Sequence, residues 1–536
     1  MGTAPVPRSE PRFAWAVAPL AIALLACAIA LRFLWVDSVP GIDGDEAQTA
    51  NEIVRAAAGL PHSYRSIARQ FFNPLMLLTE KIELALAHPS FLLLRLPAPL
   101  WASMGLLLNY LFLRWLYRDR MIALLATSFM ACMPLHLAHS RIEWDPTYLL
   151  FVLNFVLYPL LALAAGRGSR PVWLCLILAI PLCLWTHATT GLAIFTLGLS
   201  VAFVRRNDLG TWLAARLRFS NQPGVNRSGL GLAFIAVLLA FAASVLILLL
   251  RLTQQRSSHV LRNCIVMAGM LLARPSNAAA YLAHLGDAFS GQSVFDDFIG
   301  VPVTPLMRCL SLALLAAALA LSLRLLFSSS AADRALAIFW LIVPAGLIAF
   351  ASVLNIDSRG NERYILWSAP LFSLLLVRGI ASLGDFRPRR AALITLPLSG
   401  LFLFLFVRYY LIAGRYAEFM DTQDVQWTTA PIEPKAATAH WIMSALSSDA
   451  PVRVFTEEWS LQHPIQFLLG LHFNVTRNLN PTPTTPTPFF IVGYTGSSFG
   501  ALAIRAANAS HGDLIFHEIP AGNGTPFIAV WLVKSR

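Results

Sequence analysis

Long apolar segments recur along this chain of 536 residues and constrain its fold more than any other feature. A stretch of about 20 predominantly apolar residues is long enough to cross a bilayer as a helix. The first stretch, from Phe13 to Val36, is too long for a signal-peptide core, and no small-residue cleavage pattern follows it. Only 13% of the residues are charged, against about 25% in soluble domains. We therefore predict an α-helical polytopic membrane protein.

The hydropathy pattern predicts about eleven transmembrane helices. Basic loops alternate with acid-bearing loops between them, and basic loops favour the cytoplasmic side. The N-terminus is then cytoplasmic, whereas the first long loop and the tail lie outside. Within that loop, residues 51–88 are too polar to span and show helical periodicity, so we expect surface helices there; the ten-residue apolar run inside 260–286 suits an interfacial or re-entrant helix. The predicted spans are 13–36, 91–113, 121–138, 148–165, 171–186, 188–204, 230–250, 304–326, 335–353, 364–383 and 391–412.

The tail differs from the rest of the chain in composition and pattern. Residues 412–536 carry a net charge of −2, so the basic excess, +14, belongs to the membrane part and indicates orientation and phosphate binding rather than nucleic-acid binding. We predict helices at 434–447 and 460–470 and strands at 452–455, 488–494, 513–519 and 526–533. The predicted domains are therefore 1–412, a transmembrane catalytic domain whose first outer loop is 37–90, and 413–536, a small extracytoplasmic, periplasmic α/β domain.

An acidic cluster follows the first span, in the stretch "GIDGDEAQTA". Asp43, Asp45 and Glu46 lie within four positions. A solvated loop explains such a cluster equally well, because loop charges are loosely constrained. Matching groups on other outer loops favour a functional role.

The second outer loop, "HLAHSRIEWDPTYL", offers further candidates. Arg141, Glu143 and Asp145 lie there, and Asp145 could instead cap the helix that starts at Pro146. His136 and His139 are spaced to share a helix face and, with Glu143, could contact a divalent metal, although nothing fixes a third ligand. Six cysteines, mostly within apolar runs and without a CxxC pair, favour core residues over a zinc site or disulfides.

Cations also gather on the predicted outer side, against the usual bias. Arg65, Arg69 and Lys81 lie in the first outer loop, and Arg359 and Arg363 in a later one. Arginine forms bidentate pairs with phosphate, which points to a phosphorylated lipid ligand. Arg363 could equally anchor its span at the headgroups.

Acids and cations on one face suit glycosyl transfer from a lipid phosphate. A carboxylate takes the proton of the acceptor hydroxyl as that hydroxyl attacks the anomeric carbon. Cations stabilise the charge that grows on the leaving phosphate.

Several stretches resemble the GT-C glycosyltransferases of the protein O-mannosyltransferase and aminoarabinose transferase group (glycosyltransferase family 39/83-like). They are the Asp-Glu-Ala of the first outer loop, "NPLMLLTEKIELALAHPSFLLLRLPAPLW" (73–101), "MPLHLAHSRIEWDPTYLLFVL" (133–153) and "ERYILWSAPLFSLLL" (362–376). The resemblance covers residues 14–200 well, is patchy to 412 and is poor in the tail. It implies a GT-C fold, surface helices in the first outer loop, and transfer of one sugar from a polyprenyl-phosphate carrier, usually with inversion.

For particular residues, the resemblance implies that Asp45 is the catalytic base and that Glu46 supports it or touches the sugar. The second acid corresponds to Glu143 or Asp145, and Arg141 and Arg363 are phosphate candidates. The chain departs from the group at Phe72-Asn73-Pro74, where aminoarabinose transferases carry Lys-Pro-Pro. The Trp-Trp-Asp motif of oligosaccharyltransferases is also absent from the sequence, which disfavours transfer of whole glycans.

The sequence thus predicts a glycosyltransferase of the bacterial inner membrane that uses a polyprenyl-phosphate sugar and a glycan, lipid or protein acceptor. We expect no cofactor, with a divalent metal left open. One alternative is a transporter or flippase for a lipid-linked glycan, which should place ionisable groups near mid-bilayer and show repeats; Arg95 is the residue it would use. A non-catalytic subunit that only binds the lipid-linked sugar is another alternative, and it predicts that Asp45 is dispensable.

Overall fold

The computed structural model describes residues 11–42, 44–63, 73–86, 90–187, 189–206, 275–302, 304–354, 365–384, 388–416, 432–446, 452–477, 488–521 and 524–535. Its helical part contains α1 (Pro11–Phe33), α2 (Gly44–Ala57), α3 (Pro74–Leu86), α4 (Phe91–Arg95), α5 (Pro97–Tyr117), α6 (Arg120–Cys132), α7 (Pro134–His139), η1 (Asp145–Tyr148), α8 (Leu149–Val152), α9 (Asn154–Ala164), α10 (Arg170–Thr186), α11 (Thr190–Val204), α15 (Pro275–Ser290), α16 (Gln292–Ile299), α17 (Pro305–Leu326), α18 (Ala331–Leu354), α19 (Ser368–Ser382), α20 (Pro388–Leu405), η3 (Phe406–Ile412) and α21 (Ala413–Tyr416).

Ten of the eleven predicted spans coincide with helices, and 230–250 lies outside the described residues. Five stretches in the described part are long and apolar enough to cross a membrane: Ala16–Phe33, Phe91–Tyr117, Asp145–Ala164, Pro305–Leu326 and Pro388–Ile412. Within the predicted segment 51–88, the described residues include the second half of α2 and all of α3. That these helices lie on the membrane surface stays a prediction. Of the segment 260–286, only the part from Pro275 onward is described, and it belongs to α15.

Local sequence signals explain several helix ends. Asp119 accepts hydrogen bonds from the backbone N–H groups of Met121 and Ile122 and so caps α6. α6 ends at Cys132 rather than continuing to 138, because Pro134 has no N–H to extend the helix and instead starts α7. The predicted span 121–138 is therefore two helices.

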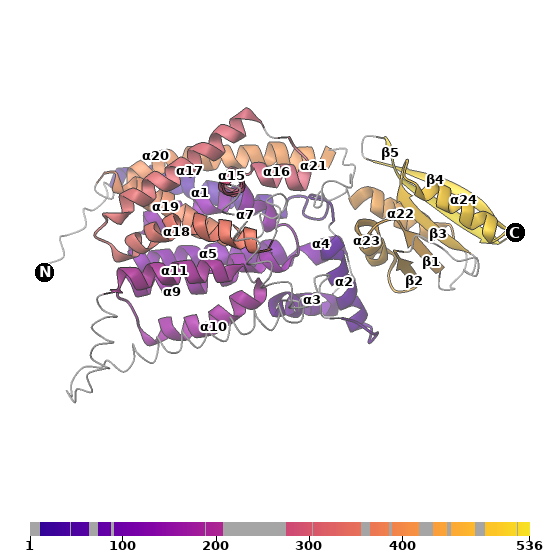
Figure 1. Cartoon of the computed structure of the whole chain (residues 1–536), viewed down its shortest axis with the longest axis horizontal. Helices are drawn as coiled ribbons and strands as arrows, with labels where there is room; N and C mark the ends of the chain where they lie inside the picture. The colour runs from indigo at the N-terminus through magenta and orange to yellow at the C-terminus, as the bar shows by residue number, and fades with distance from the viewer. Residues whose placement is uncertain are drawn as a thin grey trace.

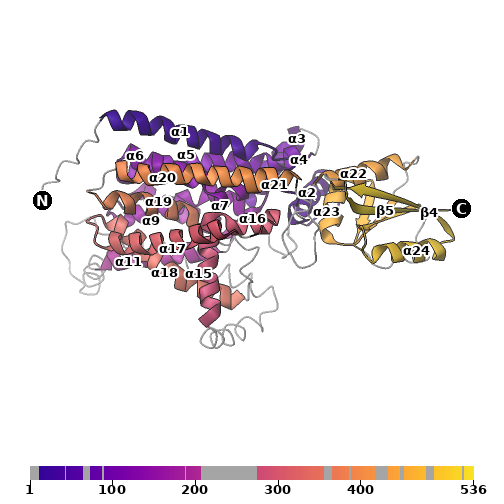
Figure 2. The ribbon, with the colours of Figure 1, turned by 90° about the horizontal axis from the view of Figure 1, so that it is seen from above.

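The arginine-bearing loops that follow α5, α9 and α11 meet at one end of the bundle. Arg167 Nη1 donates to the carbonyls of Trp115 (2.9 Å) and Leu116 (2.8 Å). Arg205 Nε donates to the carbonyl of Leu163 at 3.3 Å. The helices α2, α3 and α4 lie at the opposite end, between the bundle and the C-terminal domain (Figures 1 and 2).

The C-terminal domain has α/β architecture, as predicted. It contains α22 (Ile432–Ser444), β1 (Val452–Thr456), α23 (Trp459–Leu469), β2 (Phe473–Thr476), β3 (Phe489–Tyr494), α24 (Phe499–Ala509), β4 (Gly512–Pro520) and β5 (Pro526–Ser535). The strand order is β2-β1-β3-β5-β4. β1 pairs in parallel with β2 and β3, whereas β5 pairs antiparallel with β3 and β4. The prediction missed β2 and α24.

Candidate active site

Two buried arginines fix the backbone that leads from α1 to the acidic cluster. Arg141 is fully buried and donates to the carbonyls of Leu31, Arg32, Leu34 and Val39, with Nη2 lying 2.7 Å from both of the last two oxygens. These bonds satisfy carbonyls at the end of α1 that the helix leaves unpaired. All five N–H groups of Arg141 are engaged, so the geometry assigns it to this turn and not to the phosphate for which the sequence made it a candidate.

Arg95 holds the same turn from the other side. Its Nε lies 2.8 Å from Glu46 Oε1 and its Nη2 lies 2.7 Å from Glu46 Oε2. The remaining N–H groups donate to the carbonyls of Val36, Pro40 and Gly41 at 2.7–3.1 Å. The pair is fully buried, and a bidentate fork of this kind fixes position as well as adding energy.

Glu46 therefore joins three segments rather than standing in the open. Besides binding Arg95, its Oε1 accepts from the backbone N–H of Glu143 at 3.1 Å. The side chain is 1% exposed. Of the two roles expected for Glu46, this placement favours support of Asp45 and disfavours direct contact with a sugar.

Asp45 lies in the first turn of α2 and is half-buried. Its backbone carbonyl accepts a hydrogen bond from the Thr49 hydroxyl at 3.0 Å, within the helix. The first turn of a helix carries a partial positive charge that stabilises a carboxylate. Asp45 thus combines a fixed backbone with partial access to solvent, as a general base requires.

Glu143 and Asp145, the two candidates for the second acid, also lie near α2 and α3. Glu143 is buried, and the Tyr148 hydroxyl donates to its Oε1. Asp145 Oδ1 accepts from the backbone N–H of Asn73 at 2.9 Å and so ties this loop to the start of α3. The helix at Pro146 has Trp144 as its N-cap, without a side-chain cap bond, so Asp145 does not cap it.

A further acid, Glu80 on α3, belongs to the same region and was not singled out from the sequence. Burial raises its pKa well above the usual range, and Glu83, Asp145 and Glu46 raise it further by charge repulsion. Burial likewise raises the pKa of Glu143, with Glu80 next in effect. Burial raises the pKa of Glu83 to about 7. The only sequence signal that could have identified Glu80 is its position next to the apolar stripe of a predicted helix.

The C-terminal domain contacts the acidic stretch directly. A Cβ atom on residue 44 would lie 1.9 Å from Trp459 Cε3, so the indole ring of Trp459 lies directly against this backbone and only glycine fits. The buried Lys435 Nζ donates to the carbonyl of Ile42 at 3.2 Å. Asn51 Nδ2 donates to the carbonyl of His463 at 2.9 Å. Neither Trp459 nor Lys435 was predicted from the sequence, since this contact spans about 400 residues of chain.

The remaining candidates fall into two groups. Lys81 is described and exposed on α3, one residue from Glu80. Asp43, Arg65, Arg69, Arg359 and Arg363 lie outside the described residues. The described part therefore brings together Asp45, Glu46, Glu143 and Asp145, and leaves the phosphate-binding cations as predictions.

The histidine pair does not join an acid cluster with metal-binding geometry. His136 Nδ1 lies 2.8 Å from Arg32 Nη2, and the ring of His139 packs edge-on against Phe298. Across the described residues, no group of three or more His, Cys, Asp or Glu side chains is arranged to hold a metal ion.

Comparison with known proteins gives structural similarity without sequence similarity. No family model matches the chain, and no curated protein matches it. The fold is similar to ArnT from Cupriavidus metallidurans bound to undecaprenyl phosphate (TM-score 0.47, 13% identity, 95% of this chain and 97% of that chain). It is also similar to the apo state of that protein (TM-score 0.46, 13% identity, 96% of this chain and 98% of that chain). A third structure with a similar fold is the archaeal oligosaccharyltransferase AglB from Archaeoglobus fulgidus in complex with an inhibitory peptide and a dolichol-phosphate (TM-score 0.46, 12% identity, 98% of this chain and 75% of that chain).

Proposed function

We propose that this protein is a GT-C membrane glycosyltransferase. It moves a single sugar from a polyprenyl-phosphate carrier to a glycan, lipid or protein acceptor on the outer side of the cytoplasmic membrane. The observation that carries the proposal is the placement of Asp45: a half-buried carboxylate in the first turn of α2, on a backbone that two fully buried arginines hold.

In the proposed reaction, Asp45 accepts the proton of the acceptor hydroxyl as the hydroxyl oxygen attacks the anomeric carbon. The bond from that carbon to the phosphate oxygen breaks, and the electron pair leaves with the polyprenyl phosphate. Attack opposite the leaving group inverts the anomeric centre. Because all N–H groups of Arg141 already donate to backbone carbonyls, we assign the phosphate to other cations. These are Arg65, Arg69, Lys81, Arg359 and Arg363.

Charged side chains of the described spans weigh against the transporter alternative. Arg95, the residue that a transporter would use, is locked to Glu46. Arg32 lies in the last turn of α1. The Asp333–Arg378 pair, with Arg378 Nη2 2.5 Å from Asp333 Oδ2, lies within about one turn of the ends of α18 and α19. These charges lie at helix ends rather than at mid-bilayer, where a transport site is expected.

The test is turnover of labelled polyprenyl-phosphate monosaccharides by the purified full-length chain. Asp45→Asn should bind the donor but lose about 10²–10⁴-fold in rate. Asp37→Asn is a matched control, since Asp37 is an exposed acid in the segment that connects α1 to α2. A non-catalytic binding subunit would instead leave Asp45→Asn equal to wild type.

A further inference from the structure

The neighbouring parallel strands β1 and β3 end at the same edge of the sheet in the C-terminal domain. The helix that follows β1, α23, packs on one face of the sheet, in an apolar cluster with Val454 and Ile465. The helix that follows β3, α24, packs on the other face, in a cluster with Phe455 and Ala503. The chain therefore leaves the two strands toward opposite faces. In open α/β sheets, ligands bind outside the carboxyl ends of the strands at such a topological switch point.

Trp459 connects this edge of the sheet to the proposed base. It is the first residue of α23 and follows the end of β1 by three residues. Its indole ring lies directly against Gly44, the residue before Asp45, and successive Cα atoms are about 3.8 Å apart. Trp459 and Asp45 are both half-buried, so part of each remains exposed. The switch point of the C-terminal domain therefore lies beside the proposed reaction site.

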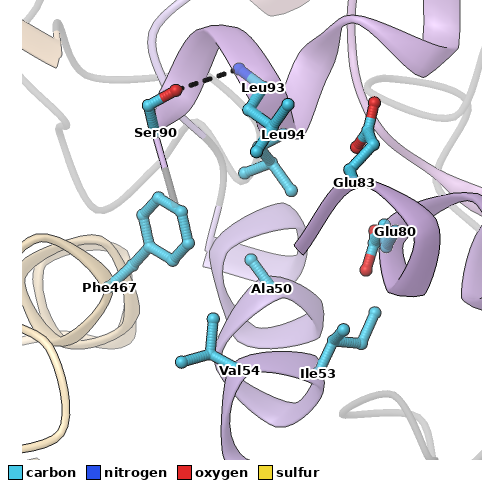
Figure 3. Close-up of a pocket in the computed structure, with 9 residues that line it drawn as sticks. All are labelled: Ala50, Ile53, Val54, Glu80, Glu83, Ser90, Leu93, Leu94 and Phe467. Atoms are coloured by element: carbon cyan, nitrogen blue, oxygen red, sulfur yellow. Dashed lines mark hydrogen bonds between the residues drawn. The ribbon is translucent and has the colours of Figure 1, made fainter. Parts of the chain in front are cut away.

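The two ends of α23 differ in how they meet α2. Figure 3 shows Phe467, near the end of α23, beside Ala50 and Val54 of α2. The hollow between these residues has a volume of about 20 Å³, room for about one water molecule. The junction is thus filled at this end. A larger ligand at the junction has to lie at the opposite end of α23, where Trp459 is half-buried.

Polar side chains surround Trp459 at this edge. Glu457 Oε2 accepts from the backbone N–H of Tyr494 at 2.9 Å, and the hydroxyls of Ser460 and Tyr494 lie 3.1 Å apart. These three residues and Glu458 are half-buried. Carboxylates and hydroxyls beside an indole ring suit a sugar, because a pyranose presents hydroxyl groups at its edge and C–H groups on its face.

Two other classes of ligand fit this edge less well. The carboxyl groups of Asp45, Glu457 and Glu458 gather here, and their negative charge disfavours a phosphate. An extended peptide binds a sheet by pairing with a free strand edge. β1 and β3 are inner strands in the order β2-β1-β3-β5-β4, so neither offers such an edge.

We propose that this edge of the C-terminal domain binds a sugar ring of the acceptor, which is then a glycan. Trp459 packs against the C–H face of the ring, and Glu457, Glu458 and Ser460 bond its hydroxyl groups. The lipid tail keeps the donor phosphate at the membrane, whereas Trp459 belongs to the domain on the far side of α2 from the bundle (Figures 1 and 2). The assignment to the acceptor rests on the proposed function, but sugar binding itself does not.

The experiment measures sugar binding without turnover. Saturation-transfer NMR on the full-length protein in nanodiscs uses methyl mannoside, methyl glucoside and methyl glucosaminide as probes. We expect at least one glycoside to bind wild type. Trp459→Leu should weaken that binding about tenfold, because it removes the aromatic contact, and Trp459→Phe should restore part of it. Ser460→Ala should weaken it about threefold to tenfold through the loss of one hydrogen bond.

Trp441→Leu is the matched control. Trp441 stacks on His517 of β4 and packs against Phe490, near the start of β3 and away from the carboxyl edge. This variant should bind the glycoside as wild type does. Donor binding should be the same in wild type and Trp459→Leu.

Competition separates the classes of ligand. Neither inorganic phosphate nor a short serine-containing peptide should displace the glycoside. Displacement by either one would overturn the proposal. So would the absence of glycoside binding by wild type, or equal binding by wild type, Trp459→Leu and Ser460→Ala. A loss of donor binding alone in Trp459→Leu would overturn the assignment to the acceptor. None of these measurements depends on turnover by Asp45, so the two proposals fail separately.

Discussion

The buried pair of Arg95 and Glu46 predicts unequal costs for its two partners. Removing one side of a buried ion pair costs about 3–5 kcal/mol, because the other charge is left uncompensated. Arg95→Met also orphans the carbonyls of Val36, Pro40 and Gly41. Glu46→Gln leaves Arg95 bonded to those carbonyls. Thermal unfolding in detergent should therefore show a larger decrease in melting temperature for Arg95→Met than for Glu46→Gln. An equal decrease would contradict the hydrogen bonds of Arg95 to these carbonyls.

Glu83 predicts a stability that depends on pH. Burial raises its pKa from the ordinary value of 4.5 to about 7 in the folded chain, so the carboxyl ionises first in the unfolded chain as pH rises. Glu83 then costs stability progressively from pH 4.5 to 7, and the cost is largest above pH 7. Glu83→Gln should match wild type in melting temperature at pH 4 and exceed it at pH 8. Because Glu83 is only half-buried, solvent screening reduces the size of this effect. A difference in melting temperature that does not depend on pH would contradict it.

For single residues, the sequence indicated which groups a side chain can bind but not which groups lie next to it in the folded chain. Arg141 was a reasonable phosphate ligand from its outer position. In the folded chain it donates to the carbonyls of Leu31 and Arg32 at the end of α1, and to the carbonyls of Leu34 and Val39 in the segment that follows. Unpaired carbonyls are present at every helix end. Glu80 was passed over for the opposite reason, since a single acid on an amphipathic helix looks like a solvated residue until its burial is known.

At the scale of elements, α2 and α23 depend on the fit between Gly44 and Trp459. Gly44→Ala should drive its Cβ into the indole, whose Cε3 would lie 1.9 Å away. We expect lower thermal stability and slower donor turnover. Trp459→Val removes the obstacle, so the double variant should recover part of both losses, with a coupling of roughly 0.5–3 kcal/mol. Additive losses would show that the two residues do not touch.

Element prediction succeeded where periodicity was strong and failed at short or interrupted segments. The long apolar runs correspond to helices across the described part of the membrane domain. The strand β2 has four residues, too few for an alternating pattern to stand out, and α24 reads "FGALAIRAANA", where small residues weaken the apolar stripe. Both depend on packing in the folded domain: β2 on its parallel pairing with β1, and α24 on the far side of the sheet.

At the scale of the whole molecule, two parts of the chain that are far apart in sequence meet at one end of the bundle. The first outer loop and the C-terminal domain share an apolar cluster that includes Ile42, Ala47 and Ala50 of the loop and Ile432 of the domain. The alternation of basic and acidic loops predicted that both lie on the same side. It could not predict that they touch, because the hydropathy of each segment carries no information about its partner.

Asp45 is the proposed base of a sugar transfer from a lipid phosphate. The most direct measurement compares wild type, Asp45→Asn and Asp37→Asn across a panel of polyprenyl-phosphate monosaccharides, recording donor binding and turnover together. We expect one accepted donor, equal donor binding by all three proteins, and a loss of about 10²–10⁴-fold in rate for Asp45→Asn alone. An Asp45→Asn protein that turns over an accepted donor at the wild-type rate would contradict it.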